Sequence, residues 1–222
     1  MENIVKQNFL AHHPLTYIGI VLFILFGVLV NIPGSFTFVV AFFTIILSLF
    51  IYDNRNHVSL FTLSLPISKR DFIAGRYIFS VATIITILII MWVAMNLLFL
   101  TQLDSDGRYL YHWKDMIILF TIGSLMLSIV LPIHYLLPFN IAASILAIGF
   151  LLGTYYYISM MVNSLERNDA DLIMLNDLDA GLIIFVEENL PFLPYIILTI
   201  GAIIALYLSM TLSTFIVKRK DV

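Results

Sequence analysis

Long apolar runs alternate with short polar segments along most of this 222-residue chain. A helix needs roughly 20 consecutive apolar residues to cross a bilayer, and all but the first two runs reach about that length. We expect the two shorter runs near the N-terminus to tilt, bend or be extended by their flanks. The six runs free of Asp, Glu, Lys and Arg are residues 15–30, 35–52, 77–100, 116–135, 140–160 and 192–217. The pattern predicts an all-α membrane protein with six transmembrane helices.

Two segments outside these runs also carry helical periodicity. Residues 2–13 place Ile4, Val5 and Phe9 near one face and end at Pro14, which favours a helix lying in the membrane interface over a frayed tail. Apolar residues between 161 and 191 recur every three or four positions, which predicts one or two short helices over the outer mouth, a solvated loop being the alternative. These residues are Leu172, Leu175, Leu178, Leu182 and Val186.

The polar loop after the second run has a more detailed local pattern. Asp53 or Asn54 is expected to cap a short helix, and Pro66 ends that helix because the residue before a proline avoids the helical region. Ser68 then caps a new helix, with Asp71 three positions on, and this helix continues into the third span. The apolar side of the short helix consists of Val58, Leu60, Phe61, Leu63 and Leu65.

Composition supports the membrane assignment. The chain is 61% hydrophobic and 11% charged, with a mean hydropathy of +1.04, whereas soluble domains carry about 25% charged residues. Cysteine is absent, so there is no disulfide framework and no thiolate metal site. Membrane proteins that use ion gradients keep ionisable groups inside their spans. We therefore expect a single domain, residues 1–222, that takes its energy from another molecule.

The basic residues predict the orientation of the bundle. With the N-terminus in the cytoplasm, eight of the 11 Lys and Arg side chains lie inside and three outside, in agreement with the positive-inside rule. The inside set is Lys6, Arg55, Lys69, Arg70, Arg76, Lys218, Arg219 and Lys220. Both termini and the loop of residues 53–76 are therefore expected on the cytoplasmic side.

Sequence patterns for catalysis are missing. No G-x-x-x-x-G-K-[ST] run is present to cradle a nucleotide phosphate. Glu187 and Glu188 form a pair like that of some intramembrane proteases, but no Arg follows at the expected spacing. The histidines lack metal-ligand spacing, and no basic patch suits nucleic acid. We expect no catalytic, cofactor or metal site. Gly149 and Gly153 allow close helix packing, either within the chain or between subunits.

The cytoplasmic loop carries a family resemblance. It opens with Asp53 and Arg55 and continues with Leu65-Pro66-Ile67-Ser68-Lys69-Arg70 and then Gly75-Arg76-Tyr77. This order resembles the cytoplasmic loop of type-two ABC transporter permeases, in the small six-span group without a fused ATPase. Two departures stand out: Asn54 replaces a frequent Glu, and His134 and Tyr135 lie where the second inner loop is often basic. The second departure puts a second docking contact in doubt.

The resemblance implies that the short helix is a coupling helix, which transmits the closure of an ATPase dimer to the spans. ATP and magnesium would then bind a separate ATPase chain, and a second permease, identical or related, would complete the transporter. The residues implied in coupling are Asp53, Arg55, Val58, Leu60, Phe61, Leu63, Leu65, Pro66, Ser68, Lys69, Arg70 and Arg76. The alternative for this loop is a basic stop-transfer segment that only fixes topology.

The cargo is the least defined part of this interpretation. The overall character is most similar to permease subunits of staphylococcal-type exporters for amphipathic peptides such as phenol-soluble modulins, although no motif separates it from permeases for bacteriocins or hydrophobic drugs. The resemblance thus implies a bacterial plasma-membrane exporter of amphipathic or hydrophobic substrates. A non-transporting scaffold or immunity protein, which sequesters a toxin or assembles a complex, is the alternative from another class.

Overall fold

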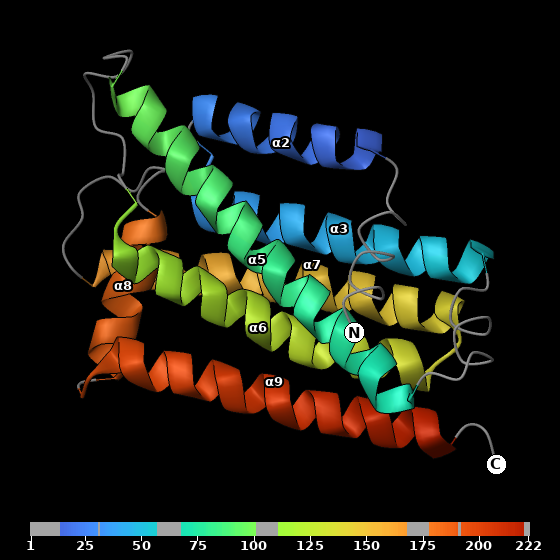
Figure 1. Cartoon of the computed structure of the whole chain (residues 1–222). Helices are drawn as coiled ribbons and strands as arrows, with labels where there is room; N and C mark the ends of the chain where they lie inside the picture. Colours follow the sequence, from blue (N-terminus) through green and yellow to red (C-terminus); the bar gives the residue numbers. More distant parts are fainter. Residues whose placement is uncertain are drawn as a thin grey trace.

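The chain folds as a helical bundle with one helix lying across its end (Figure 1). The computed structural model describes residues 14–30, 32–56, 68–100, 111–167, 178–190 and 192–219, and the regular structure in these ranges is helical throughout. The helices are α2 (Pro14–Leu29), α3 (Gly34–Asn56), α5 (Lys69–Leu100), α6 (Trp113–Leu136), α7 (Phe139–Glu166), α8 (Leu178–Asn189) and α9 (Pro194–Arg219). The interfacial helix predicted for residues 2–13 lies outside the described residues.

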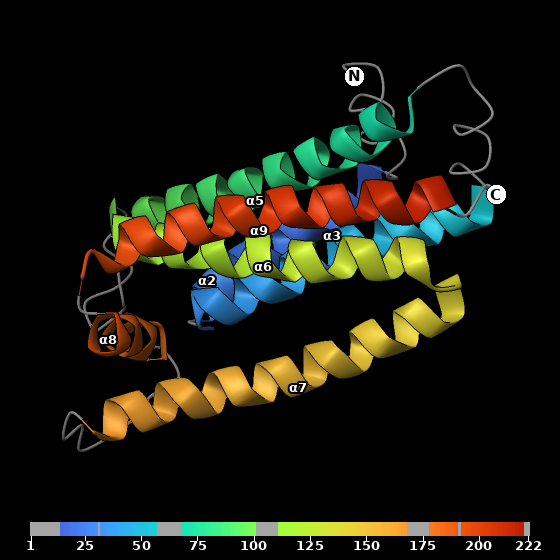
Figure 2. The ribbon, with the colours of Figure 1, turned by 90° about the horizontal axis from the view of Figure 1, so that it is seen from below.

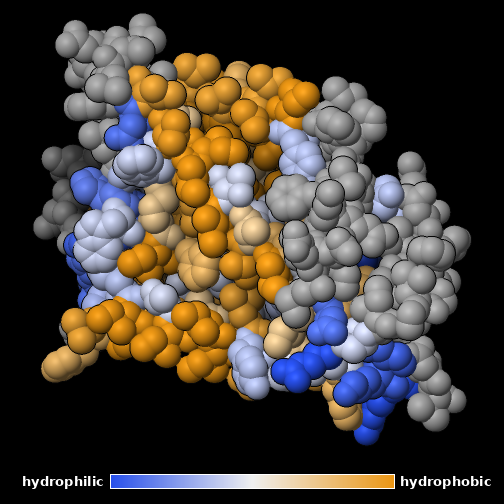
Figure 3. Space-filling model, in the orientation of Figure 1, coloured by the Kyte–Doolittle hydropathy of each residue, from blue (hydrophilic) through white to orange (hydrophobic). Residues whose placement is uncertain are grey.

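The long helices alternate in direction, and this gives the bundle two distinct ends. At one end of the bundle, which we call the far end, α3, α6 and α9 end and α2, α5 and α7 begin. α8 lies across the opposite end, which we call the α8 end (Figure 1). Hydrophobic residues dominate the middle of the molecular face in Figure 3, and hydrophilic residues gather toward its two ends. This distribution is that of a bundle whose middle lies in hydrocarbon.

Five of the described helices, α3, α5, α6, α7 and α9, are long and apolar enough to cross a membrane. α2 has 16 residues, which corresponds to a length of about 24 Å, against a hydrocarbon core of about 30 Å. α2 nevertheless packs into the largest core cluster through Ile20, Ile24 and Val28. The apolar runs thus correspond to helices, while the number of spans depends on how α2 lies in the membrane.

Two helix ends near the polar loop differ in how well the sequence predicts them. α3 continues through Asp53 and Asn54 to Asn56, so the prediction that Asp53 or Asn54 caps a new helix is wrong: the α3 ladder continues past the last apolar residue. The predicted cap at Ser68 is confirmed, because the Ser68 hydroxyl accepts a hydrogen bond from the Asp71 amide at 3.1 Å. α5 then runs without a break from Lys69 into the apolar run.

Lipid-facing surfaces explain much of the exposed apolar area. In the most apolar 18-residue stretch of each helix, only 11% of α7 and 17% of α9 is buried, compared with 56% of α3. Lipid tails are as apolar as leucine, so apolar burial alone does not drive membrane helices together; packing and polar links do. The polar links between helices are therefore important in holding this bundle together.

A buried carboxylate holds α8 on the bundle. Asp179 of α8 accepts hydrogen bonds from the backbone amides of Gly34 at 2.8 Å and Ser35 at 3.1 Å, and from the Tyr111 hydroxyl at 2.9 Å. The first amides of a helix have no partner within it, so Asp179 caps α3 from another part of the chain, an interaction of about 1 kcal/mol. A Cβ atom on Gly34 would lie 1.1 Å from the Tyr111 hydroxyl, so this close approach requires glycine.

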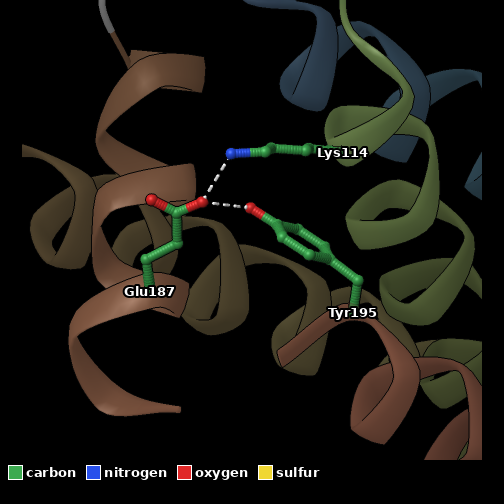
Figure 4. A network of polar contacts seen from close by, with 3 residues as sticks. All are labelled: Lys114, Glu187 and Tyr195. Carbon is green, nitrogen blue, oxygen red and sulfur yellow. Dashed lines mark hydrogen bonds and ion pairs between the residues drawn. The ribbon is translucent and has the colours of Figure 1, made fainter. Parts of the chain in front are cut away.

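A second polar network joins α8 to α6 and α9 (Figure 4). Glu187 accepts hydrogen bonds from Lys114 and from the Tyr195 hydroxyl, both at 2.8 Å. The hydrogen bond from Lys114, with that from Tyr195, lowers the pKa of Glu187 below its ordinary value. Burial, reinforced by the neighbouring Asp179, raises the pKa of Tyr111 well above its ordinary value, so Tyr111 keeps its proton and donates.

The apolar face predicted for the segment before the last span is confirmed where it is described. Leu178, Leu182 and Val186 are buried in a cluster with Met161 and Leu165 of α7. The remaining residues of that pattern, Leu172 and Leu175, lie outside the described residues. α8 is therefore a short amphipathic helix that packs chiefly on the last turns of α7.

Candidate functional site

An ion pair joins the two helices that flank the polar loop. Asp53 lies in the last turns of α3 and Arg76 in the third turn of α5, at the far end of the bundle. The Arg76 guanidinium forms an ion pair with the Asp53 carboxylate, and the two side chains are 0% and 4% exposed. The ion pair thus joins the end of α3, where the polar loop begins, to the first turns of α5, where the loop ends.

α6 contributes a third side to this cluster. His134 Nε2 lies 3.8 Å from the Asp53 carboxylate, and the imidazole ring stacks on Phe50 of α3 with a centroid separation of 3.8 Å and an interplanar angle of 2°. On the other side, the Arg76 guanidinium lies 4.8 Å from the centre of the Phe72 ring. The cluster therefore ties the ends of α3, α5 and α6 together.

Burial determines what this cluster contributes energetically. A buried ion pair adds little net stability over a well-packed apolar pair, because both charges lose their hydration. Removing one partner, however, costs about 3–5 kcal/mol, since the other charge stays buried and unpaired. The pair therefore works mainly as a specific link: as long as this end of the bundle stays closed to water, each buried charge has its counter-charge on the other helix.

A second buried link joins α5, α6 and α9 nearer the middle of the bundle. The Tyr77 hydroxyl is hydrogen-bonded to Ser209 at 2.5 Å and to Ser213 at 3.0 Å, both on α9. Ser209 in turn donates to the backbone oxygen of Ser128 on α6 at 2.7 Å. Arg76 and Tyr77, adjacent in the sequence, therefore anchor α5 to helices on opposite sides.

Comparison with known proteins identifies the family. A family model described as "ABC-2 family transporter protein" matches residues 3–218, almost the whole chain. The chain belongs to the ABC-2 transporter family. Neither the comparison with curated proteins nor that with solved structures found a match. Family membership confirms the coarser part of the resemblance: this is an ABC-2 family membrane protein, of a family whose membrane subunits work with an ATPase subunit.

The residues implied in coupling to that ATPase fall into two groups. Asp53, Ser68, Lys69, Arg70 and Arg76 are described; Ser68 and Arg70 are exposed, Lys69 is half-buried, and the two ion-pair residues are buried. Arg55 lies in the last turn of α3. Those that would form the short helix and its end lie outside the described residues: Val58, Leu60, Phe61, Leu63, Leu65 and Pro66. The structure thus shows the helix ends on either side of residues 57–67 of this ABC-2 protein, and a coupling role for that segment stays a prediction.

Arg76 corrects one expectation. The positive-inside count treats Arg76 like Lys69 and Arg70, as a basic residue of the cytoplasmic loop, but Arg76 is fully buried and paired with Asp53. Sequence reasoning also missed His134 as the third member, treating it as a departure from a basic residue. In the sequence, Asp53 directly follows one apolar run and Arg76 directly precedes the next, on the same predicted side of the membrane. Two opposite charges at these positions were the available sign that the residues form an ion pair.

Most polar groups within the apolar helices of this ABC-2 protein are satisfied locally. The side chains of Thr83, Thr86, Asn96 and Ser128 each donate to the backbone oxygen four residues earlier, at 2.7–2.9 Å. A hydroxyl that donates to a backbone oxygen of its own helix has its hydrogen satisfied without a partner on another helix. Within the described residues, no group of three or more His, Cys, Asp or Glu side chains is placed to hold a metal ion.

The predicted close packing at Gly149 and Gly153 is not made by the described part of the chain. No atom there lies within 4 Å of a Cβ built on either glycine. Both glycines instead line a cavity of about 340 Å³ between α3, α6 and α7. A contact with a second subunit at these positions stays a prediction.

Proposed function

We propose that this chain is the transmembrane permease subunit of an ATP-driven exporter, coupled to a separate ATPase chain through the loop of residues 53–76. The observation that carries the proposal is the buried Asp53–Arg76 pair. A loop docked on a moving ATPase transmits that movement to the two flanking helices only if the helices stay together where the loop joins them. The Asp53–Arg76 pair links α3 and α5 at that place.

Charge and helix direction support a cytoplasmic position for this loop. The positive-inside count places eight basic residues with the loop and three on the other side. The alternating directions of the described helices support this arrangement, because α2 begins and α9 ends at the far end. We therefore propose six spans, with α2 accommodated by local thinning of the bilayer, and cytoplasmic termini in a bacterial plasma membrane.

The nature of the interior supports an amphipathic or hydrophobic cargo, with peptides as the leading class. Charged side chains at membrane depth normally mark the path of an ion or polar substrate. The charge-free runs and the locally bonded hydroxyls leave surfaces that suit apolar matter. Phenol-soluble modulins represent this class of cargo. A second permease, identical or related, would supply the other wall of the path.

Reconstitution with the co-purifying ATPase tests the proposal. The permease should change the rate of ATP turnover, and Phe61→Asp or Leu63→Asp should abolish that change, because a buried docking face does not accept a charge. Thr62→Asp is the matched control: it adds the same charge to the same segment away from the proposed apolar side. All three variants should insert into membranes normally.

Two results would contradict coupling through this loop. One is full ATPase stimulation by Phe61→Asp and Leu63→Asp protein that is correctly inserted. The other is the failure of any nucleotide-hydrolysing chain to co-purify from native membranes. A scaffold or immunity protein predicts both results, so the same experiment separates the two functions.

A further inference from the structure

The cavity between α3, α6 and α7 has the dimensions of a lipid chain. It lies where α7 diverges from the rest of the bundle (Figure 2) and has a volume of about 340 Å³. Along α7 its lining runs from Ile145 to Tyr157, a distance of about 18 Å at the helical rise per residue. Half of a hydrocarbon core of about 30 Å is about 15 Å. The cavity is therefore about as long as one leaflet is thick.

Water and protein are poor candidates for the occupant. The lining is almost wholly apolar, with Phe43, Met126 and Phe150 among its side chains, and the Thr154 hydroxyl already donates to the Phe150 backbone oxygen at 2.8 Å. Apolar cavities of this kind stay dry. A helix 10 Å wide and 18 Å long would need about 1,400 Å³, which is more than this cavity holds.

Hydrocarbon is the remaining material at this depth. An empty cavity would forfeit the dispersion contacts of every atom that lines it, and the cavity is only partly enclosed. Leu151 and Leu152 of α7, beside the lining glycines, are 67% and 55% exposed, so this stretch of α7 borders the bilayer. Gly149 and Gly153 leave room that any larger residue would fill.

The cavity lining includes Tyr157 at the end nearer α8. The Tyr157 hydroxyl is buried beside Ser35 and has almost no accessible surface, so it does not open into the cavity. The cavity therefore suits hydrocarbon alone, and the ester groups of a bound lipid would lie outside it.

We propose that one acyl chain of a membrane phospholipid occupies this cavity. The site is independent of whether the chain exports a cargo, because it requires only that α3, α6 and α7 lie in a bilayer. The bound chain completes the packing between α7 and the bundle.

Lipid retention tests this site. Protein reconstituted in phosphatidylglycerol vesicles, extracted into mild detergent and weighed by native mass spectrometry should keep one phospholipid per chain. The Gly149→Leu/Gly153→Leu variant should lose this lipid, because the leucine side chains fill the cavity. Gly201→Leu is the matched control: Gly201 also has open space around it, but it lies on α9, outside the cavity lining, and should leave retention unchanged.

A second measurement uses the unmodified chain and so does not depend on folding of the variant. Phosphatidylglycerol with a photoreactive group in one acyl chain, retained after extraction and then activated, should label residues 145–157 of α7 or 122–133 of α6. Labelling of α9 alone, no retained phospholipid, or equal retention by the double variant and the unmodified chain would each overturn the proposal. Retention of a peptide or of detergent in place of phospholipid would overturn it as well.

Discussion

Removing the acidic partner of the buried ion pair should destabilise the protein strongly. In Asp53→Asn, the Arg76 guanidinium stays at 0% exposure without a counter-charge, and an arginine cannot lose its proton to escape. We expect a loss of about 3–5 kcal/mol in the free energy of unfolding. Arg76→Met should cost less, because a buried carboxylate can take up a proton and His134 lies 3.8 Å away.

The double variant Asp53→Asn/Arg76→Met distinguishes the interaction between the two side chains from the contribution of each side chain alone. With neither charge buried, its stability should return to within about 1–2 kcal/mol of the unmodified protein, since replacing a whole buried pair is often neutral. The assay is reversible unfolding in mixed detergent–SDS micelles, followed by far-ultraviolet circular dichroism. The deviation from additivity then measures the interaction between the two side chains.

An exposed ion pair provides the comparison. Lys114 and Glu187 are also oppositely charged partners, but they are 37% and 45% exposed, and such pairs contribute about 0–1 kcal/mol. Lys114→Met should therefore change stability much less than Asp53→Asn. The reasoning is refuted if Asp53→Asn costs no more than Lys114→Met, or if the double variant is as unstable as the sum of the single changes.

Two further predictions concern the α8 end. Gly34→Ala should destabilise the fold by roughly 1–3 kcal/mol in the same unfolding assay, because its methyl group would lie 1.1 Å from the Tyr111 hydroxyl; Gly201→Ala, in open space, should not, and equal effects would contradict the assigned contact. Because the pKa of Glu187 is lowered in the folded protein, its contribution to the free energy of unfolding is complete above the ordinary pKa of 4.5. That contribution is lost as the pH falls through the lower pKa of the folded state. The stability difference between the unmodified protein and Glu187→Gln should therefore shrink on acidification below that value, staying under about 1 kcal/mol throughout because the side chain is exposed; a difference that does not change with pH would argue against the network.

The apolar runs predicted the helices well because membrane helices need long uncharged stretches. They predicted the ends less well. The run of residues 35–52 stops at Asp53, yet α3 continues to Asn56, and the run that starts at Tyr77 belongs to a helix that starts at Lys69. A charged residue ends an apolar run but does not by itself end a helix, since charged side chains are compatible with helical backbone; what it needs near the membrane is water or a partner. Here Asp53 and Arg76 are partners for each other.

Long-range pairings account for what the sequence did not reveal. Asp179 caps α3 across 145 positions of sequence, and no local pattern marks it as different from the other acids of its loop. His134 looked like a missing basic residue until its distance to Asp53 was known. The Gly149–Gly153 spacing predicted close helix packing, but spacing alone does not say whether a helix or a cavity lies opposite, and in the described part of the chain both glycines line a cavity.

The way α7 is held has a mechanical consequence. At the far end it is joined to α6 through only Leu137 and Pro138, and at the other end its last turns pack on α8, which Asp179 fastens to α3. α7 is thus held at both ends, and in its middle Phe150 stacks on Phe43 of α3 with ring centroids 4.5 Å apart. We expect bending of α7 to change the width of the cavity beside it more than the position of its two ends.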